Sequence, residues 1–126
     1  MTIALVPWIV LAGGTGALVR YLLITALPLT QARPLPRGVL VVNLLGSLIA
    51  GITLGLVYRS LISMDVALIV WVGFCGGLTT FSTVAVETIL IGRERPRLGW
   101  WNIGVTTVGG CACAAVGFAF AGLLGT

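Results

Sequence analysis

Hydroxyl side chains gather in one short stretch of an otherwise apolar chain. Four of the five residues from Thr79 to Thr83 are Thr or Ser, and two adjacent glycines, Gly76 and Gly77, come just before them. Paired glycines weaken a helix, and an interrupted helix leaves backbone carbonyls that protein, an ion or water must satisfy. Broken helices of this kind mark ion sites at membrane depth. The alternative is a continuous helix that uses its hydroxyls for packing.

After the break, Thr80, Thr83 and Glu87 share one face of a helix, because their spacing is i, i+3, i+7. Hydroxyl groups can donate hydrogen bonds that replace the water a small anion loses. Phe81 can offer its ring edge, which carries positive partial charge. Thr80, Phe81 and Thr83 are therefore predicted to face an anion, whereas an ionised Glu87 has no place in such a path.

Two further polar residues lie inside apolar runs, where polar groups are costly and default to a functional hypothesis. Asn43 is an amide near one end of the second run, with Ser47 one helical turn later. It donates either to an anion or to a neighbouring helix. Arg20 lies about three-quarters along the first run. It is either a cation at the mouth of an anion path or a side chain that snorkels to the headgroups.

The elements that position these residues are four apolar runs, each near the roughly 20 residues needed to cross a bilayer as a helix. They cover about residues 3–29, 38–58, 66–91 and 98–124. Of the 126 residues, 59% are hydrophobic and only 8% are charged, which leaves too little polar surface for a water-soluble domain. Residues 1–126 are therefore predicted to form one all-α membrane domain of four transmembrane helices, the third broken near its middle.

Composition also excludes several classes of protein. There is no His and no Cys-x-x-Cys pair, and the three cysteines lie inside apolar runs, where they are interpreted as small buried residues. Apart from Arg20, the seven arginines stand singly or in threes between apolar runs, which is typical of topology-setting loops and not of a nucleic-acid surface. With no nucleotide-binding motif, neither an enzyme nor an organic cofactor is expected.

Small residues recur four apart in the first two runs, as Ala12 and Gly16, Gly13 and Ala17, and Gly51 and Gly55. Such pairs let helix backbones approach closely in lipid, either within one subunit or between subunits. Four short helices do not easily enclose a pore alone, so a dimer is expected.

The arginines also predict an orientation. The first and third connections carry Arg33, Arg37, Arg93, Arg95 and Arg97, whereas the second carries only Arg59. Because short cytoplasmic loops are enriched in Arg, the first group is expected inside the cell and both termini outside.

Over its whole length the chain resembles the Fluc/CrcB family of fluoride channels. The resemblance is carried by Gly13–Arg20, by Gly38–Gly46 and above all by Gly73–Thr83 with Glu87. It implies a fluoride-selective channel subunit for passive export, in an antiparallel dimer with two pores, in the plasma (inner) membrane of a bacterium. It also implies that Asn43 and Phe81 line the pores, that Arg20 lies in a vestibule, and that the carbonyls of Gly76 and Thr79 bind a structural sodium ion between the subunits.

Two positions depart from the family pattern. Val84 stands where a second Phe is usual, and Gly110 stands where Ser is frequent. Together with the arginine bias, these departures favour half of a heterodimer with an oppositely oriented homologue, while a homodimer stays open. Alternatives from other classes are a small proton-coupled exporter, which needs a midplane carboxylate, and a purely structural membrane subunit, which leaves the hydroxyl cluster unexplained.

Overall fold

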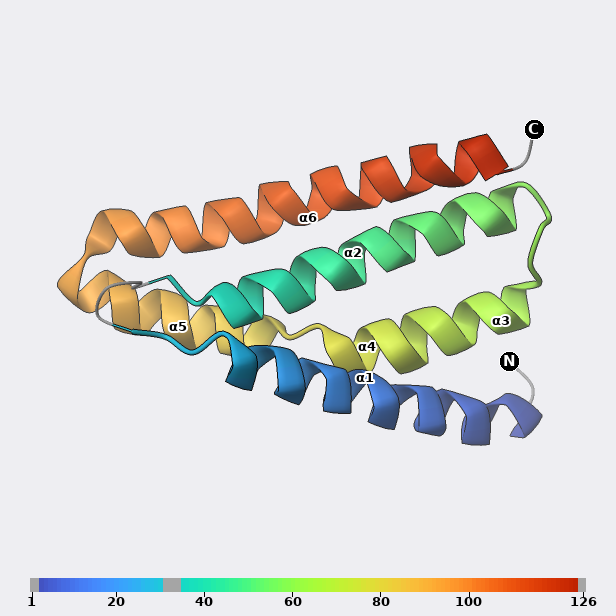
Figure 1. The fold of residues 1–126 in the computed structure, drawn as a ribbon, viewed down its shortest axis with the longest axis horizontal. Coiled ribbons are helices and arrows are strands. Elements are labelled where there is room, and N and C mark those ends of the chain that lie inside the picture. The colour runs from blue at the N-terminus through green and yellow to red at the C-terminus, as the bar shows by residue number, and fades with distance from the viewer. Residues whose placement is uncertain (1–2, 31–34, 125–126) are drawn as a thin grey trace.

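The computed structural model describes residues 3–30 and 35–124, and it folds them into four long helical segments that lie side by side (Figure 1). All four are long and apolar enough to cross a membrane, as predicted. The first is a short 3-10 turn, η1 (Ile3–Leu5), followed by α1 (Val6–Ala26), and the second is α2 (Arg37–Tyr58). The third comprises α3 (Met64–Leu68), η2 (Ile69–Cys75), α4 (Gly76–Leu78) and α5 (Phe81–Glu94), and the fourth is α6 (Pro96–Leu124).

The third segment changes its neighbour at the point where it breaks. Before the break, η2 and α4 pack against α1, and after it α5 packs against α6, which also packs along α2 (Figure 1). Between the two halves, Thr79 and Thr80 have extended backbone angles, with ψ values of 157° and 121°. The prediction of a third helix broken near its middle is confirmed.

The break does not fall at the paired glycines, which corrects the sequence-based reasoning. Gly76 has helical angles of φ −62° and ψ −38°, and the chain leaves the helix only at Thr79. Gly77 instead allows close packing, because a Cβ there would collide with the carbonyl oxygen of Gly13 in α1. In an apolar environment a helix persists through glycine, since each broken backbone hydrogen bond is costly.

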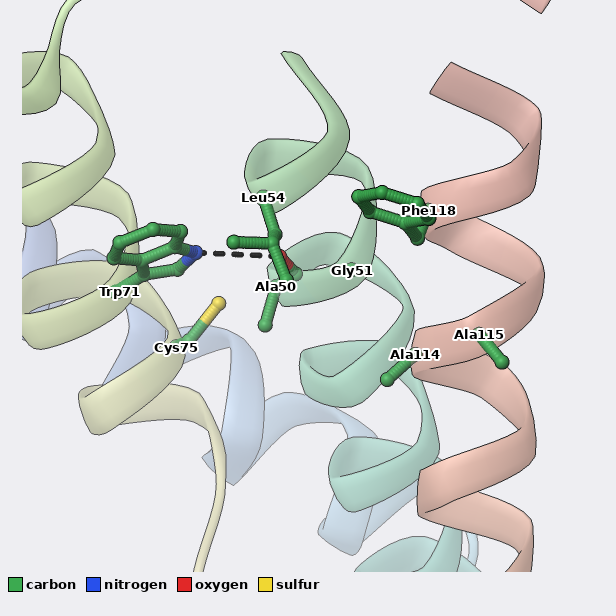
Figure 2. Close-up of a pocket in the computed structure, with 8 residues that line it drawn as sticks. All are labelled: Ala50, Gly51, Leu54, Trp71, Cys75, Ala114, Ala115 and Phe118. Carbon is green, nitrogen blue, oxygen red and sulfur yellow. Dashed lines mark hydrogen bonds between the residues drawn. The ribbon is translucent and has the colours of Figure 1, made fainter. Parts of the chain in front are cut away.

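A π-helix, η2, precedes the break and has no counterpart in the sequence-based prediction. Its wide turn is completed by the N–H of Gly76, which donates to the carbonyl of Trp71, five residues earlier. The indole Nε1 of Trp71 donates to the carbonyl of Ala50 in α2 over 3.2 Å (Figure 2). π-Helical turns of this kind are frequent next to functional sites.

The small-residue pairs pack helices within the chain. A Cβ at Gly16 would lie 2.9 Å from the backbone nitrogen of Leu78, and a Cβ at Gly55 would lie 3.0 Å from the carbonyl of Phe118. Gly51 likewise meets the backbone of Ala114. The first pairs therefore hold α1 against η2 and α4, and the last holds α2 against α6.

The two ends of the bundle differ in charge. The N-terminal end of α1 and the C-terminal end of α6 lie at the end that carries the α2–α3 turn (Figure 1). The α5–α6 turn lies at the opposite end, together with Arg37 at the start of α2. Arg33 falls outside the described residues. Arg37 and the arginine-rich α5–α6 turn therefore share one end of the bundle, as the sequence predicts.

Candidate functional site

The side-chain amide of Asn43 pairs with both backbone groups of Thr80 at the break. Its Oδ1 accepts a hydrogen bond from the Thr80 N–H over 2.8 Å, and its Nδ2 donates to the Thr80 carbonyl over 3.0 Å. The two bonds fix the orientation of the amide, because a backbone N–H can only donate. Asn43 therefore stabilises an extended residue inside a transmembrane segment, and one of its two amide hydrogens has no acceptor among the described residues.

This pairing also frees a carbonyl. In a continuous helix, the Thr80 N–H would donate to the carbonyl of Gly76, four residues earlier. Since that N–H bonds to Asn43 instead, the Gly76 carbonyl loses its helical donor. The interruption therefore leaves a main-chain oxygen without a helical donor inside a candidate membrane span.

The hydroxyl cluster caps the second half of the broken helix. The Thr80 side chain accepts from the N–H of Thr83 over 3.3 Å, which makes Thr80 the N-cap of α5. Its hydroxyl also lies 3.0 Å from that of Thr83 and 3.3 Å from that of Ser82. Thr80 is thus the cap of α5 rather than a residue of its first turn, because its backbone is extended.

A groove of about 440 Å³ lies beside the break, between α2, the break and α6, and we call it the polar groove. Its described lining residues are Asn43, Ser47, Thr79, Thr80, Phe81, Val84, Ile103, Thr106, Thr107, Gly110, Cys111 and Ala114. None of these is acidic. The structure therefore brings together three of the four residues predicted to face an anion, whereas Thr83 contacts Thr80 without being among the lining residues.

The two positions on α5 that line the polar groove differ in exposure. Phe81 is 79% exposed, so its ring has little contact with its own subunit, whereas Val84 is only 3% exposed. A large apolar ring left bare beside hydroxyl groups is available to a second chain or to an ion. Val84 is covered within the subunit, and its small side chain fits that place.

Hydroxyls on α2 and α6 add donors that the sequence analysis did not assign to the site. Ser47 and Thr107 line the polar groove, and neither side chain has a hydrogen-bond partner within residues 3–30 and 35–124. A Cβ at Gly110 would lie 3.1 Å from the Ser47 hydroxyl oxygen. Gly110 therefore leaves room for a hydroxyl that comes from α2. The adjacent pair Thr106 and Thr107 inside the fourth span was the signal available in the sequence.

Arg20 reaches the break and not the headgroup region. Its Nη1 donates to the carbonyl of Thr79 over 3.2 Å. This contact removes the snorkelling alternative, because the guanidinium is held near the middle of the third segment. A positive charge therefore lies close to the polar groove, although Arg20 is not among the residues that line it.

The carbonyls of Gly76 and Thr79 are the oxygens that the family resemblance assigns to sodium. The first has lost its helical donor, and the second accepts from Arg20 but keeps a second lone pair. The described residues contain no cluster of three or more His, Cys, Asp or Glu that could bind a metal ion. A cation here would therefore depend on oxygen ligands, and the two main-chain oxygens of one chain are too few to replace its hydration shell without a second contributor.

Glu87 lies away from the polar groove. It is partly buried in α5, and its Oε2 is covered and has no hydrogen-bond partner among the described residues. Its side chain is not among those that line the polar groove. The predicted shared face of Thr80, Thr83 and Glu87 therefore does not form one lining surface.

A second groove, of about 610 Å³, lies on the same side of the bundle and shares Ala114 with the polar groove. Figure 2 shows its lining residues on α2, η2 and α6, among them Leu54, Trp71 and Phe118. The Trp71 N–H is already bonded to Ala50, and the Cys75 thiol lies 3.6 Å from the carbonyl of Gly46. This second groove therefore has no free donor for an anion among its described residues.

These features define a class of protein: a four-span integral membrane protein whose third span breaks beside a donor-lined groove with no acid among its described residues. Residues 7–118 match the family model described as "CrcB-like protein, Camphor Resistance (CrcB)". The chain belongs to the CrcB family.

Relatives with similar sequences carry channel names. The "Fluoride-specific ion channel FluC" of Pyrococcus furiosus is 42% identical over 71% of this chain and 72% of its own length. The protein of that name from Escherichia coli is 40% identical over 86% of each chain. "Fluoride-specific ion channel FluC 2" of Mycolicibacterium paratuberculosis is 38% identical over 92% of this chain and 93% of its own length.

Proposed function

We propose that this chain is a subunit of a fluoride-selective channel that lets fluoride leave the cell passively. The observation that carries the proposal is the polar groove, which combines unpaired donors with a nearby arginine and has no acid among its described lining residues. The channel names of relatives that align over most of this chain support the same function.

Each lining group has a role in such a path. Fluoride must lose water on entry, and the free amide hydrogen of Asn43 and the hydroxyls of Ser47 and Thr107 replace it. Phe81 presents a ring whose edge attracts an anion. Arg20 raises the local concentration of anions, because its guanidinium is held at the Thr79 carbonyl beside the polar groove. An inside-negative membrane potential favours exit by about 2.3 kcal/mol per charge per 100 mV.

The groove of one chain is open on one side, so the complete pore in this proposal needs a second subunit in antiparallel orientation. The exposed ring of Phe81 then contacts the partner, and the breaks of the two subunits lie next to each other. The partner is either a second copy of this chain or an oppositely oriented homologue, and the arginine bias favours the homologue. The assembly belongs in the plasma membrane of a bacterium.

A structural sodium ion fits the same arrangement. The carbonyls of Gly76 and Thr79 from each subunit would hold it, because the Asn43–Thr80 pairing leaves the first of them without a helical donor. Bound there, the cation would coordinate main-chain oxygens that lipid cannot satisfy. Within each subunit, Asn43 and Arg20 keep those oxygens in position.

The test is ion efflux from liposomes that contain the purified chain, alone and with its homologous partner. Fluoride should leave loaded vesicles while chloride stays inside. Comparable chloride flux, or no flux with any partner, would rule the proposal out. Efflux that needs an opposing proton gradient would instead indicate an exporter, and an inert but assembled protein would indicate a structural subunit.

A further inference from the structure

The outer face of α6 carries a groove of about 680 Å³ that the packing of the subunit does not use. Its described lining residues all belong to α6 and include Arg97, Trp100, Trp101, Gly104 and Val108. The opposite face of the helix makes the internal contacts. There Asn102 donates to Thr88 in α5, and Gly117 packs against the backbone of α2. We call the outward-facing hollow the α6 groove.

The α6 groove has the length of one membrane leaflet. From Arg97 to Val108 the helix rises about 16 Å, at about 1.5 Å per residue. Half of the hydrocarbon core of a bilayer is about 15 Å. Trp100 and Trp101 are 77% and 61% exposed at the arginine end, where tryptophan is enriched at the boundary between headgroups and acyl chains.

Another groove, smaller than the α6 groove, lies on the other side of Trp100. It has a volume of about 430 Å³, and Gly92, Arg93, Gly99 and Trp100 are among its lining residues. Each of the two grooves thus contains one arginine, and they share Trp100 as a common wall.

Each groove contains a helical glycine whose Cβ position is open. A Cβ at Gly92 or at Gly104 would meet no atom within 4 Å, unlike most helical glycines of this chain. Glycine costs a helix about 1 kcal/mol relative to alanine. The space next to these two glycines, like that next to Gly14 in α1, is therefore open to a group from outside the subunit.

Charge indicates what that occupant is. Arg93, Arg95 and Arg97 form no ion pair within the described residues, and Glu94 is the one acid among them in sequence. At the N-terminal end of α6, by contrast, the backbone N–H groups of Leu98 and Gly99 already donate to the carbonyl of Arg95. The arginine side chains are therefore the groups available to an anion. With seven arginines and three acids per chain, copies of this protein cannot neutralise one another. Anionic headgroups of the surrounding membrane can.

We propose that the two grooves bind one anionic phospholipid, with its phosphate at Arg93 and Arg97 and its acyl chains on either side of Trp100. The lipid fills the space between the α5–α6 hairpin and the bulk bilayer. This site adjoins the polar groove, with which the smaller of the two grooves shares Ile103. The proposal does not depend on which ion the protein conducts.

The experiment counts lipids that stay bound to the purified protein in native mass spectrometry. The protein is mixed with equal amounts of phosphatidylglycerol and phosphatidylcholine that carry the same acyl chains. The wild-type chain should retain phosphatidylglycerol preferentially. Arg97→Gln should lower that preference about fivefold, the ratio that corresponds to about 1 kcal/mol per arginine at a membrane surface. Arg59→Gln, at the opposite end of the bundle, is the matched control and should leave the preference unchanged.

A second variant tests the acyl-chain part. Gly104→Leu places a large side chain in the α6 groove, at a position where a Cβ would meet no atom of the subunit within 4 Å, so it should lower the retention of both lipids while the fold is kept. Equal retention of the two lipids by the wild type, or an unchanged preference in Arg97→Gln, would overturn the proposal. If Gly104→Leu leaves bound lipid unchanged and dissociates a dimer, the α6 groove is an interface with a second copy and the lipid assignment is wrong.

Discussion

Asn43 satisfies both backbone groups of Thr80 and still has one amide hydrogen for a ligand. Sequence reasoning left two readings of this residue open, a hydrogen bond inside the protein or a donor to an anion. The structure gives the internal bond, and the position of Asn43 on the polar groove leaves the second use available. One side chain can serve both because an amide has two donor hydrogens.

Asn43→Asp should therefore damage both uses. A carboxylate still accepts from the Thr80 N–H, but it opposes the Thr80 carbonyl and adds negative charge to the polar groove. We expect a loss of about 1–3 kcal/mol in stability, the penalty for an unsatisfied buried group, and at least about a tenfold loss of fluoride flux, which corresponds to about 1.4 kcal/mol. Thermal unfolding in detergent and liposome efflux measure the two effects.

The matched control is Asn102→Asp, which puts a carboxylate at a buried position outside the polar groove, where Asn102 donates to the Thr88 hydroxyl. It should lower stability while the flux per folded channel stays near the wild-type value. Full flux in Asn43→Asp would show that the residue does not line the conducting path.

Phe81→Ile tests the exposed ring. Since 79% of the side chain is exposed, the subunit loses little packing, and its unfolding temperature should change little. Fluoride flux should fall strongly, because isoleucine keeps bulk but has no ring edge with positive partial charge. Phe120→Ile makes the same replacement at a half-exposed site of α6 outside the polar groove, and it should conduct normally. Equal flux from both variants would remove Phe81 from the pore.

At the scale of elements, the third span breaks in the middle because its two halves pack against different helices. Its first half is held by α1 through small residues, and its second half is held by α6. A straight helix could not follow both neighbours, so the chain unwinds at Thr79 and Thr80, where a side chain from α2 can replace the lost bonds. The π-helix η2 lies directly before this change of direction.

The paired glycines give a prediction at this scale, because the two have different surroundings. Gly77→Ala should destabilise the fold by about 1–3 kcal/mol, the range for overpacking a tight contact, since its Cβ would collide with the backbone of Gly13 in α1. Gly76→Ala should be tolerated, because its nearest neighbour would be the Trp71 carbonyl at 3.6 Å. Thermal unfolding of the two variants provides the comparison. Equal losses in both would mean that helix propensity, and not contact with α1, decides the outcome.

At the scale of the whole molecule, charge separates the two ends of the bundle. The described arginines at the α5–α6 end include Arg37, Arg93, Arg95 and Arg97, whereas Arg59 lies at the other end near the termini. Short loops with excess arginine stay in the cytoplasm. An antiparallel dimer of one fixed orientation therefore needs a partner with the opposite charge distribution.

Reporter fusions at the C-terminus test this orientation. One reporter is active only in the cytoplasm, and the other only outside it. We expect a signal from the external reporter alone, because the C-terminal end of α6 lies opposite the arginine-rich end (Figure 1). Equal signals from both reporters would mean dual orientation and would favour a homodimer. Replacing Arg93, Arg95 and Arg97 together by Gln should weaken the bias toward one orientation.

The sequence alone determined the four spans and the presence of a break. The length and apolarity of each run are local properties, and a helix is the element that satisfies its own backbone in lipid. For that reason the predicted runs of about 3–29, 38–58, 66–91 and 98–124 differ from the helical spans by only a few residues. The family pattern around Gly73–Thr83 likewise lies within one continuous stretch of sequence.

Only the tertiary structure decided where the third helix breaks and what satisfies it. Glycine spacing favoured Gly76 and Gly77, but the break lies at Thr79 and Thr80, where Asn43 replaces the lost backbone bonds from 37 residues away in the chain. Arg20 reaches Thr79 across 59 residues. Propensity measures what a residue does to its own helix, whereas the position of an opening in lipid depends on which neighbouring helix brings a donor and an acceptor to it.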